Sequence, residues 1–190
     1  IYEIYFHYYK KYKKHYSRLA VNFLFIVFDT IIVRLVFPVL VVGAALIFSK
    51  YDIGILNLFS LPLWLSIIIA LLLLDLGIWL QHYIFHYNCM FWVFHKIHHS
   101  DEKMDFSTAL RFHPIEIILS TIIKSFYVIL IGPPVVAVII FEILINVVSI
   151  FNHSNIYIPK RFELILRKII VTPNMHRIHH SIVKKETNSN

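Results

Sequence analysis

The sequence contains little cysteine and little charge. Cys89 is the only cysteine among 190 residues, which excludes an intrachain disulfide and a structural zinc site built on cysteine pairs. Asp, Glu, Lys and Arg make up 15% of the chain, whereas 58% is hydrophobic and the mean hydropathy is +0.71. One domain of this length cannot bury so much apolar surface in water. We therefore expect an integral membrane protein.

The charge that is present is mostly positive. Eighteen Lys and Arg residues outnumber eleven Asp and Glu residues, which gives a net charge of +7. On a membrane protein this excess fits anionic lipid headgroups at the cytoplasmic surface rather than nucleic acid. Residues 1–18 hold five of these cations and six tyrosines, so we predict an interfacial segment there.

Hydropathy predicts an all-α protein with about four membrane-embedded helices. These segments are residues 19–48, 61–80, 115–131 and 135–151. The first is too long for one simple span, so it is either a surface helix followed by a span or one tilted and kinked span. The last two are separated by Gly132, Pro133 and Pro134, which predicts a tight turn and a helical hairpin.

Basic residues predict the orientation of these spans. Residues 1–18, 87–114 and 153–190 hold fifteen of the eighteen Lys and Arg residues, whereas the opposite loop, residues 49–60, holds Lys50 alone. The positive-inside rule places the first three regions in the cytosol. The membrane would be a bacterial inner membrane, or the endoplasmic reticulum of a eukaryote.

Nine of the twelve histidines form motifs or follow the last span, at or beyond helix ends on that predicted cytosolic side. They form one HxxxH motif, two HxxHH motifs and a single residue after the last span: His82 and His86; His95, His98 and His99; His176, His179 and His180; and His153. Spacings of three and four place side chains on one helix face. One HxxxH is a weak signal, but the combined set is specific. The alternative is a histidine-rich surface that senses pH or binds headgroups.

Imidazole is the commonest metal ligand among side chains. Nine histidines exceed the four to six ligands that saturate one first-row ion, so two ions are the natural number. Neutral imidazole suits Zn, Cu, Fe and Ni. No carboxylate shares the spacing of the motifs, which argues against a Glu-x-x-His di-iron bundle. We expect a cytosolic helical cap that holds these ligands.

Two acids inside the predicted spans are candidates for supporting roles, because an ionisable side chain within a membrane span is by default a hypothesis of function. Asp75 and Glu142 lie near whole numbers of helical turns before histidines of their own helices, and Asn146 follows Glu142 by one turn. They could support ligands from neighbouring helices or line a polar track to the metals. The alternative is helix packing, with a protonated acid or with Lys124 as the partner.

Arg111 and His113 stand just before the third predicted span. Arg111 could orient a carboxylate or a headgroup. His113 could be a ligand, a residue supporting a ligand, or a structural residue beside the start of a helix. We assign both to the surroundings of the metal site, and the sequence singles out no substrate-binding residue.

Three motifs resemble those of a known family. The segments HYIFH, HKIHH and TPNMHRIHH, which begin at residues 82, 95 and 172, are similar to the histidine boxes of the fatty acid hydroxylase/sterol desaturase superfamily. The resemblance covers residues 61–190 and implies a catalytic domain there, cut short at its C-terminus, with residues 1–60 as an interfacial segment and first membrane segment. His153 matches a further family histidine, and Ser149 stands where some members have another.

The resemblance implies an integral membrane, non-haem di-iron oxygenase. Such enzymes use O2 and external electrons to hydroxylate or desaturate lipid chains and sterols. By position, the eight box histidines would be iron ligands together with His153, and zinc could replace iron during purification. The sequence shows no flavin, haem or ferredoxin motif. Electrons would then come from a cytochrome b5-like protein, a ferredoxin or a reductase.

Two other classes of protein combine spans with histidines. A divalent-metal transporter is one, but transporters usually place their sites near the midplane, whereas these histidines lie beyond helix ends. A catalytically silent relative that binds metal or lipid is the other. Two irons per chain and an O2-dependent product would distinguish the enzyme from both.

Overall fold

The computed structural model describes residues 7–8, 15–37, 41–101 and 103–187. The elements are α2 (His15–Val36), α3 (Val41–Phe48), η1 (Ser49–Tyr51), η2 (Ile55–Leu58), α4 (Leu63–Tyr87), α5 (Cys89–His95), η3 (His98–Ser100), η4 (Phe106–Leu110), α6 (Pro114–Ile131), α7 (Val135–His153), α8 (Lys160–Leu166), α9 (Pro173–His179) and α10 (Lys184–Thr187). The described residues contain no strand, only an isolated bridge between His7 and Ile156. The all-α prediction is confirmed. Most of the interfacial segment predicted over residues 1–18 lies outside the described residues.

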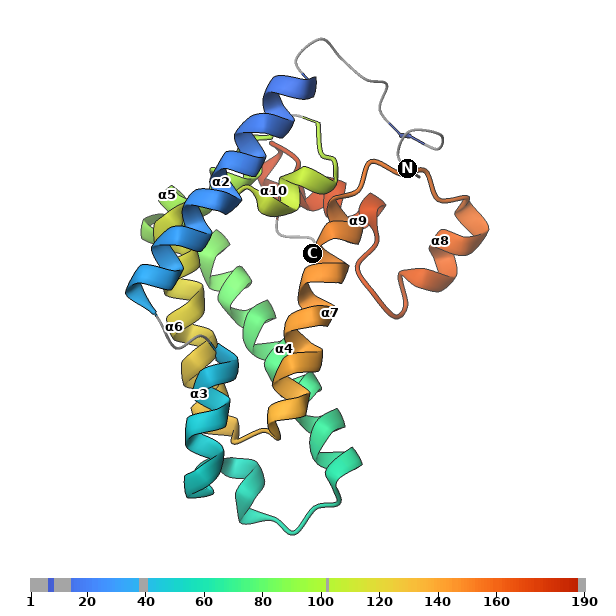
Figure 1. Ribbon diagram of the computed structural model, residues 1–190. Helices are drawn as coiled ribbons and strands as arrows, with labels where there is room; N and C mark the ends of the chain where they lie inside the picture. The colour runs from blue at the N-terminus through green and yellow to red at the C-terminus, as the bar shows by residue number, and fades with distance from the viewer. Residues whose placement is uncertain (1–6, 9–14, 38–40, 102, 188–190) are drawn as a thin grey trace.

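Four regions are long and apolar enough to cross a membrane. They are Tyr16–Leu58, Leu63–Tyr87, Pro114–Ile131 and Val135–His153. The first is interrupted, because α2 ends at Val36 and α3 begins at Val41. Figure 1 shows these two helices following one another down one side of the bundle. The described part of this segment therefore holds two helices, α2 and α3, rather than one straight helix.

The predicted helical hairpin is confirmed, and its ends have the expected chemistry. Pro114 is the first residue of α6, where a missing N–H is harmless. Gly132 ends α6 in the left-handed conformation, with φ 64°. Pro134 then precedes α7. The hairpin returns the chain to the end from which it left, which we call the histidine end (Figure 1).

Small residues let the helices of the bundle approach closely. Ala45, Ala70 and Ala137 are buried in the apolar core formed by α3, α4, α6 and α7. Close backbone approach is how helices gain packing contacts where lipid is the solvent. Many large apolar side chains instead face outward, as expected for a surface in contact with lipid.

At the end opposite the histidines, the backbones of Gly54 and Gly132 are in contact and leave no room for a side chain. A Cβ added at Gly132 would lie 2.4 Å from the Ile53 carbonyl oxygen and 2.6 Å from Asn57 Nδ2. We expect Gly132→Ala to lower the free energy of unfolding by at least about 1–2 kcal/mol. Alanine would have to adopt the left-handed backbone conformation, and its Cβ would also clash with Ile53 and Asn57. Thermal unfolding in detergent measures the loss. Gly77→Ala is the control, since its Cβ would meet only the Tyr127 ring, at 3.1 Å. Equal losses would contradict the prediction.

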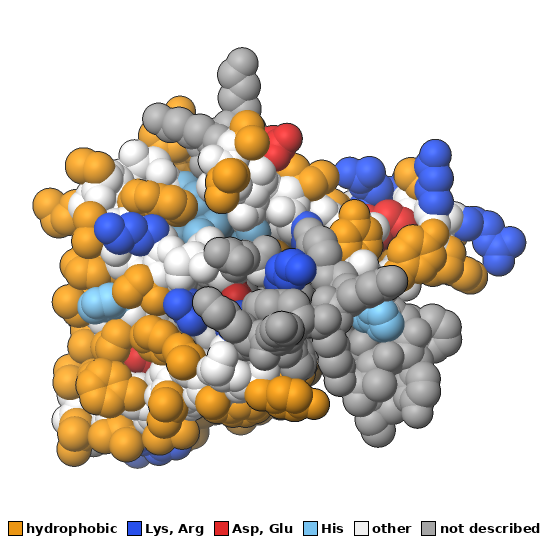
Figure 2. Space-filling model, turned by 90° about the horizontal axis from the view of Figure 1, so that it is seen from above, with side chains coloured by type: hydrophobic (Ala, Val, Ile, Leu, Met, Phe, Trp, Pro, Cys, Tyr) orange, Lys and Arg blue, Asp and Glu red, His pale blue; other side chains and the backbone are white. Residues whose placement is uncertain are grey.

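The histidine end carries a helical cap made by the remaining elements. α5, η3 and η4 lie between α4 and α6 in the chain, and α9 packs against α7. Figure 1 shows α8 projecting to one side of the bundle at this end. Seen from this end, some histidine side chains are visible between apolar ones, and basic side chains gather on the projecting side (Figure 2).

Candidate metal centre

The nine predicted ligands come from five elements that meet at the histidine end. The last turns of α4 carry His82 and His86, α5 ends at His95, η3 holds His98 and His99, α7 ends at His153, and α9 with its C-cap holds His176, His179 and His180. Local sequence explains the last of these helices. Thr172 caps α9 by accepting a hydrogen bond from the Met175 amide, and Pro173 occupies the first position.

The first cluster consists of His82, His86, His95 and His179. Their ligand atoms all lie within 4.8 Å of one another. The Nε2 atoms of His82 and His179 are 2.8 Å apart, and those of His86 and His95 are 3.1 Å apart. Four imidazoles from three helices therefore point their Nε2 atoms toward one another.

The second cluster consists of His98, His153, His176 and His180, again within 4.8 Å of one another. His153 Nε2 lies 3.0 Å from His98 Nε2 and 3.0 Å from His176 Nε2. His153 is therefore the centre of this cluster. The cluster forms without a histidine at position 149.

His99 lies between the two clusters. Its ring stacks on His180 with a centroid separation of 4.1 Å, and it is 4.7 Å from His86 and 4.8 Å from His179. Both of its ring nitrogens are buried without a hydrogen-bond partner among the described residues. It is thus available to either cluster.

Three of the clustered histidines have a hydrogen-bond acceptor beside the outer nitrogen of the ring. His95 Nδ1 lies 2.6 Å from Glu116 Oε1, His98 Nδ1 lies 3.2 Å from the Arg111 carbonyl oxygen, and His153 Nδ1 lies 2.7 Å from the Ser149 carbonyl oxygen. Carbonyl oxygens only accept, so the proton of His98 and of His153 belongs on Nδ1. That tautomer turns the Nε2 lone pair toward the cluster.

Burial keeps the cap histidines neutral. It lowers the pKa of His98, His99 and His180 well below the ordinary value and that of His179 to about 3, and neighbouring imidazoles lower each pKa further. A group with a lowered pKa is unprotonated at neutral pH. Neutral imidazole is the form that binds a metal.

The residues present fit two first-row ions. Lone pairs on facing Nε2 atoms repel one another unless a cation lies between them. Two nitrogens that would each lie about 2.1 Å from one ion can be at most about 4.2 Å apart. The observed Nε2 separations of 2.8–3.1 Å lie within this limit.

The structure places Arg111 and His113 differently from each other. Arg111 lies against the segment that carries His98 and donates from Nε to the Ile97 carbonyl oxygen at 3.0 Å. His113 belongs to neither cluster. It caps α6, since its Nδ1 accepts a hydrogen bond from the Ile115 amide at 3.1 Å. Of its proposed roles, the structural one matches this placement.

Asp75, Glu142 and Asn146 are not brought to the clusters. Asp75 is exposed on α4 and has no hydrogen bond or ion pair with the residues that the structure describes. Glu142 pairs with Lys124 across α6 and α7, with Lys124 Nζ 2.8 Å from Oε1. Asn146 is exposed and donates to the Glu142 carbonyl oxygen at 2.7 Å. Helix rise explains the separation, because seven residues span roughly 10 Å.

Glu116 is the residue that sequence reasoning missed. An acid in the first turn of a helix is commonly explained by its favourable interaction with the helix dipole. In the structure it is 3% exposed and contacts His95. A signal was present: an acid in an otherwise apolar stretch, at the end of a span that faces the histidines.

Membrane-length helices with two all-histidine clusters at one end define a helical membrane protein with a double histidine centre. Residues 67–190 match the family model of fatty acid hydroxylases, so the chain belongs to this family. The resemblance seen in the sequence is confirmed.

Two curated proteins are similar to the chain. An ornithine lipid hydroxylase, OlsE, of Rhizobium tropici is 26% identical over 129 residues, which are 68% of this chain and 38% of that protein. The alkylglycerol monooxygenase of Homo sapiens is 34% identical over 134 residues, which are 65% of this chain and 27% of that protein. The chain thus spans well under half the length of these relatives. No solved structure matches it.

Proposed function

We propose that this chain is a membrane-bound, two-iron oxygenase that hydroxylates a lipid with O2 and external electrons. The observation that carries the proposal is the convergence of eight histidine side chains into two clusters at one end of the bundle. Family membership supports it, as do two relatives named as a lipid hydroxylase and a monooxygenase. These names favour hydroxylation over desaturation.

The histidines would hold the metals in two sets. His82, His86, His95 and His179 would bind one ion, and His98, His153, His176 and His180 the other, with His99 between them. When bound, two irons supply the binding and reduction of O2 that oxidises an unactivated C–H bond. Hydroxylation inserts one oxygen atom into that bond and reduces the other to water, which consumes two electrons and two protons.

The chain's own groups prepare the site for this chemistry. Glu116 and the carbonyl groups of Arg111 and Ser149 fix the orientation of three ligand rings. Burial of His95, His98 and His179 keeps water from their nitrogens. A dry site with oriented ligands protects reactive species from side reactions.

The lipid substrate would come from the bilayer. Two ligands lie in the last turns of α4 and one ends α7, so the metals would sit at the membrane surface rather than at its midplane. The excess of basic residues at this end favours the cytosolic side. An electron donor there, such as a cytochrome b5-like protein, a ferredoxin or a reductase, would reach the metals from the aqueous side.

The test compares lipids of cells that express the wild-type protein with those of cells that express His98→Ala. We expect a lipid that gains 16 mass units in wild-type cells, carries label from 18O2, and is absent with His98→Ala. Equal lipid profiles would count against the enzyme. Metal uptake that depends on the protein, without a lipid product, would instead support the transporter.

A further inference from the structure

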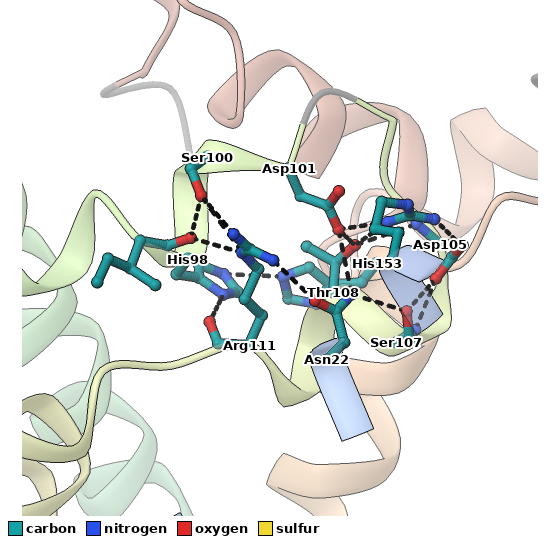
Figure 3. A network of polar contacts seen from close by, with 11 residues as sticks. Asn22, His98, Ser100, Asp101, Asp105, Ser107, Thr108, Arg111 and His153 are labelled. Carbon is teal, nitrogen blue, oxygen red and sulfur yellow. Dashed lines mark hydrogen bonds and ion pairs between the residues drawn. The ribbon is translucent and has the colours of Figure 1, made fainter. Parts of the chain in front are cut away.

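A buried polar network joins α2 to the loop that carries His98 (Figure 3). Asn22, on α2, is 0% exposed although most of its helix is apolar. Arg18, one turn earlier, pairs with Asp101 through Nη1 and with Asp105 through Nη2. The loop element η4 packs against both α2 and α7. The network thus links the first spanning region to the cap.

Asn22 uses both ends of its amide in this network. Its Oδ1 accepts a hydrogen bond from Arg111 Nη1 at 3.0 Å, and its Nδ2 donates to Ser107 Oγ at 2.9 Å and to Asp101 Oδ2 at 3.3 Å. Buried polar groups destabilise a protein unless they are hydrogen-bonded. A network that pairs both ends of a buried amide favours one arrangement of the segments it joins.

Arg111 carries that arrangement to a metal ligand. Its Nε donates to the Ile97 carbonyl oxygen at 3.0 Å, and its own carbonyl oxygen lies 3.2 Å from His98 Nδ1. Phe112, the next residue, stacks on the His98 ring with a centroid separation of 4.4 Å and an angle of 5°. The position of Arg111 therefore decides the hydrogen bond and the stacking contact of His98.

We propose that Asn22 and Arg18 are positioning residues for the second metal. They hold Arg111, and through it the His98 ring, in the orientation that turns Nε2 toward His153. Both residues precede the stretch that matches the family model, residues 67–190. α2 is therefore part of the metal centre and not only a membrane anchor. This inference rests on the proposed two-metal site.

The test measures iron at each cluster in purified full-length protein. Asn22→Leu keeps about the same side-chain volume but removes both hydrogen-bonding groups. We expect its affinity for the second iron to fall about tenfold or more, as when an outer hydrogen-bond partner of a ligand is lost, while the first iron stays bound. Elemental analysis would fall from about two irons per chain toward one. Mössbauer spectra of 57Fe protein would lose one of two signals.

Two further variants make the test specific. Thr30→Val also removes a polar group from α2. Among the described residues, Thr30 bonds only to its own helix, at the Ile26 carbonyl oxygen, so both irons should stay. Asn22→Gln keeps both the carbonyl oxygen that faces Arg111 and the amide donor, so it should restore much of the second-iron affinity lost in Asn22→Leu. It also serves if the Leu variant fails to fold.

Three results would overturn the inference. One is full affinity for both irons in Asn22→Leu. A second is equal loss at both clusters, and a third is an Asn22→Gln protein that binds the second iron no better than Asn22→Leu. Failure of the wild-type protein to bind a second iron is a different result, because it contradicts the proposed two-metal site itself.

Discussion

His153→Ala is expected to abolish product formation and to remove one of the two metals. Its Nε2 lies 3.0 Å from the Nε2 atoms of both His98 and His176, and the side chain is 3% exposed. Loss of an outer partner of a ligand lowers affinity or activity about 10–100-fold. Loss of the central ligand itself should lower turnover more than about a hundredfold. Iron per chain and the rate of lipid oxidation with an added electron donor measure the two effects.

His113→Ala is the matched control for this prediction. His113 is also near the histidine end, but it belongs to neither cluster and caps α6. Its removal should destabilise the protein by about 1 kcal/mol, as for loss of other helix caps, while both metals stay bound. Loss of a metal from His113→Ala would mean that the ligand sets have been assigned wrongly.

Local patterns allowed the spans and the histidine set to be predicted. A run of apolar residues sets the length of a spanning helix, and the residues at its ends set where it stops. Gly132 and Pro134 mark the turn between α6 and α7, and the structure has both helix ends there. Such signals depend only on neighbours in the chain.

The division of the histidines into two clusters was not predictable in this way. Each HxxHH motif contributes to both clusters. In α9, His176 and His180 belong to the second cluster and His179 to the first. In the first HxxHH motif, His95 belongs to the first cluster and His98 to the second. The chain changes direction between them, because α5 ends at His95 and η3 begins at His98. Sequence spacing shows which histidines share a helix face. Which cluster each histidine joins depends on the helices that pack around that face.

The sequence also did not show how far along its helix a polar side chain lies from the histidine clusters. Glu142 shares a helix face with His153, so the sequence allowed a role near the metals. Its actual partner is Lys124 on the neighbouring helix, an alternative that the sequence also left open. Periodicity gives the direction of a side chain, but distance along the axis and the identity of the neighbouring helix decide what it contacts.

Glu116→Leu is expected to have the second large effect, and it should act on the first cluster. His95 is 1% exposed, and its Nδ1 lies 2.6 Å from Glu116 Oε1. Leucine leaves this buried nitrogen without a partner and frees the ring to rotate. Affinity for the first iron should fall about 10–100-fold, as for other outer partners of ligands. Glu116→Gln keeps an acceptor oxygen and should lose less. Iron titration with Mössbauer detection measures the change.

Asp75→Asn is the control, because Asp75 is an acid on α4 that is exposed and lies away from the clusters. It should retain both irons and full activity. Glu116→Leu can also be compared with Asn22→Leu, because Glu116 contacts His95 whereas Asn22 acts through Arg111 on His98. Glu116→Leu should weaken the iron bound through His95 and spare the one bound through His98, whereas Asn22→Leu should do the reverse. If both variants lost the same iron, then the two clusters would not be separate sites, and the pairing of each ligand with its outer partner would have to be reassigned.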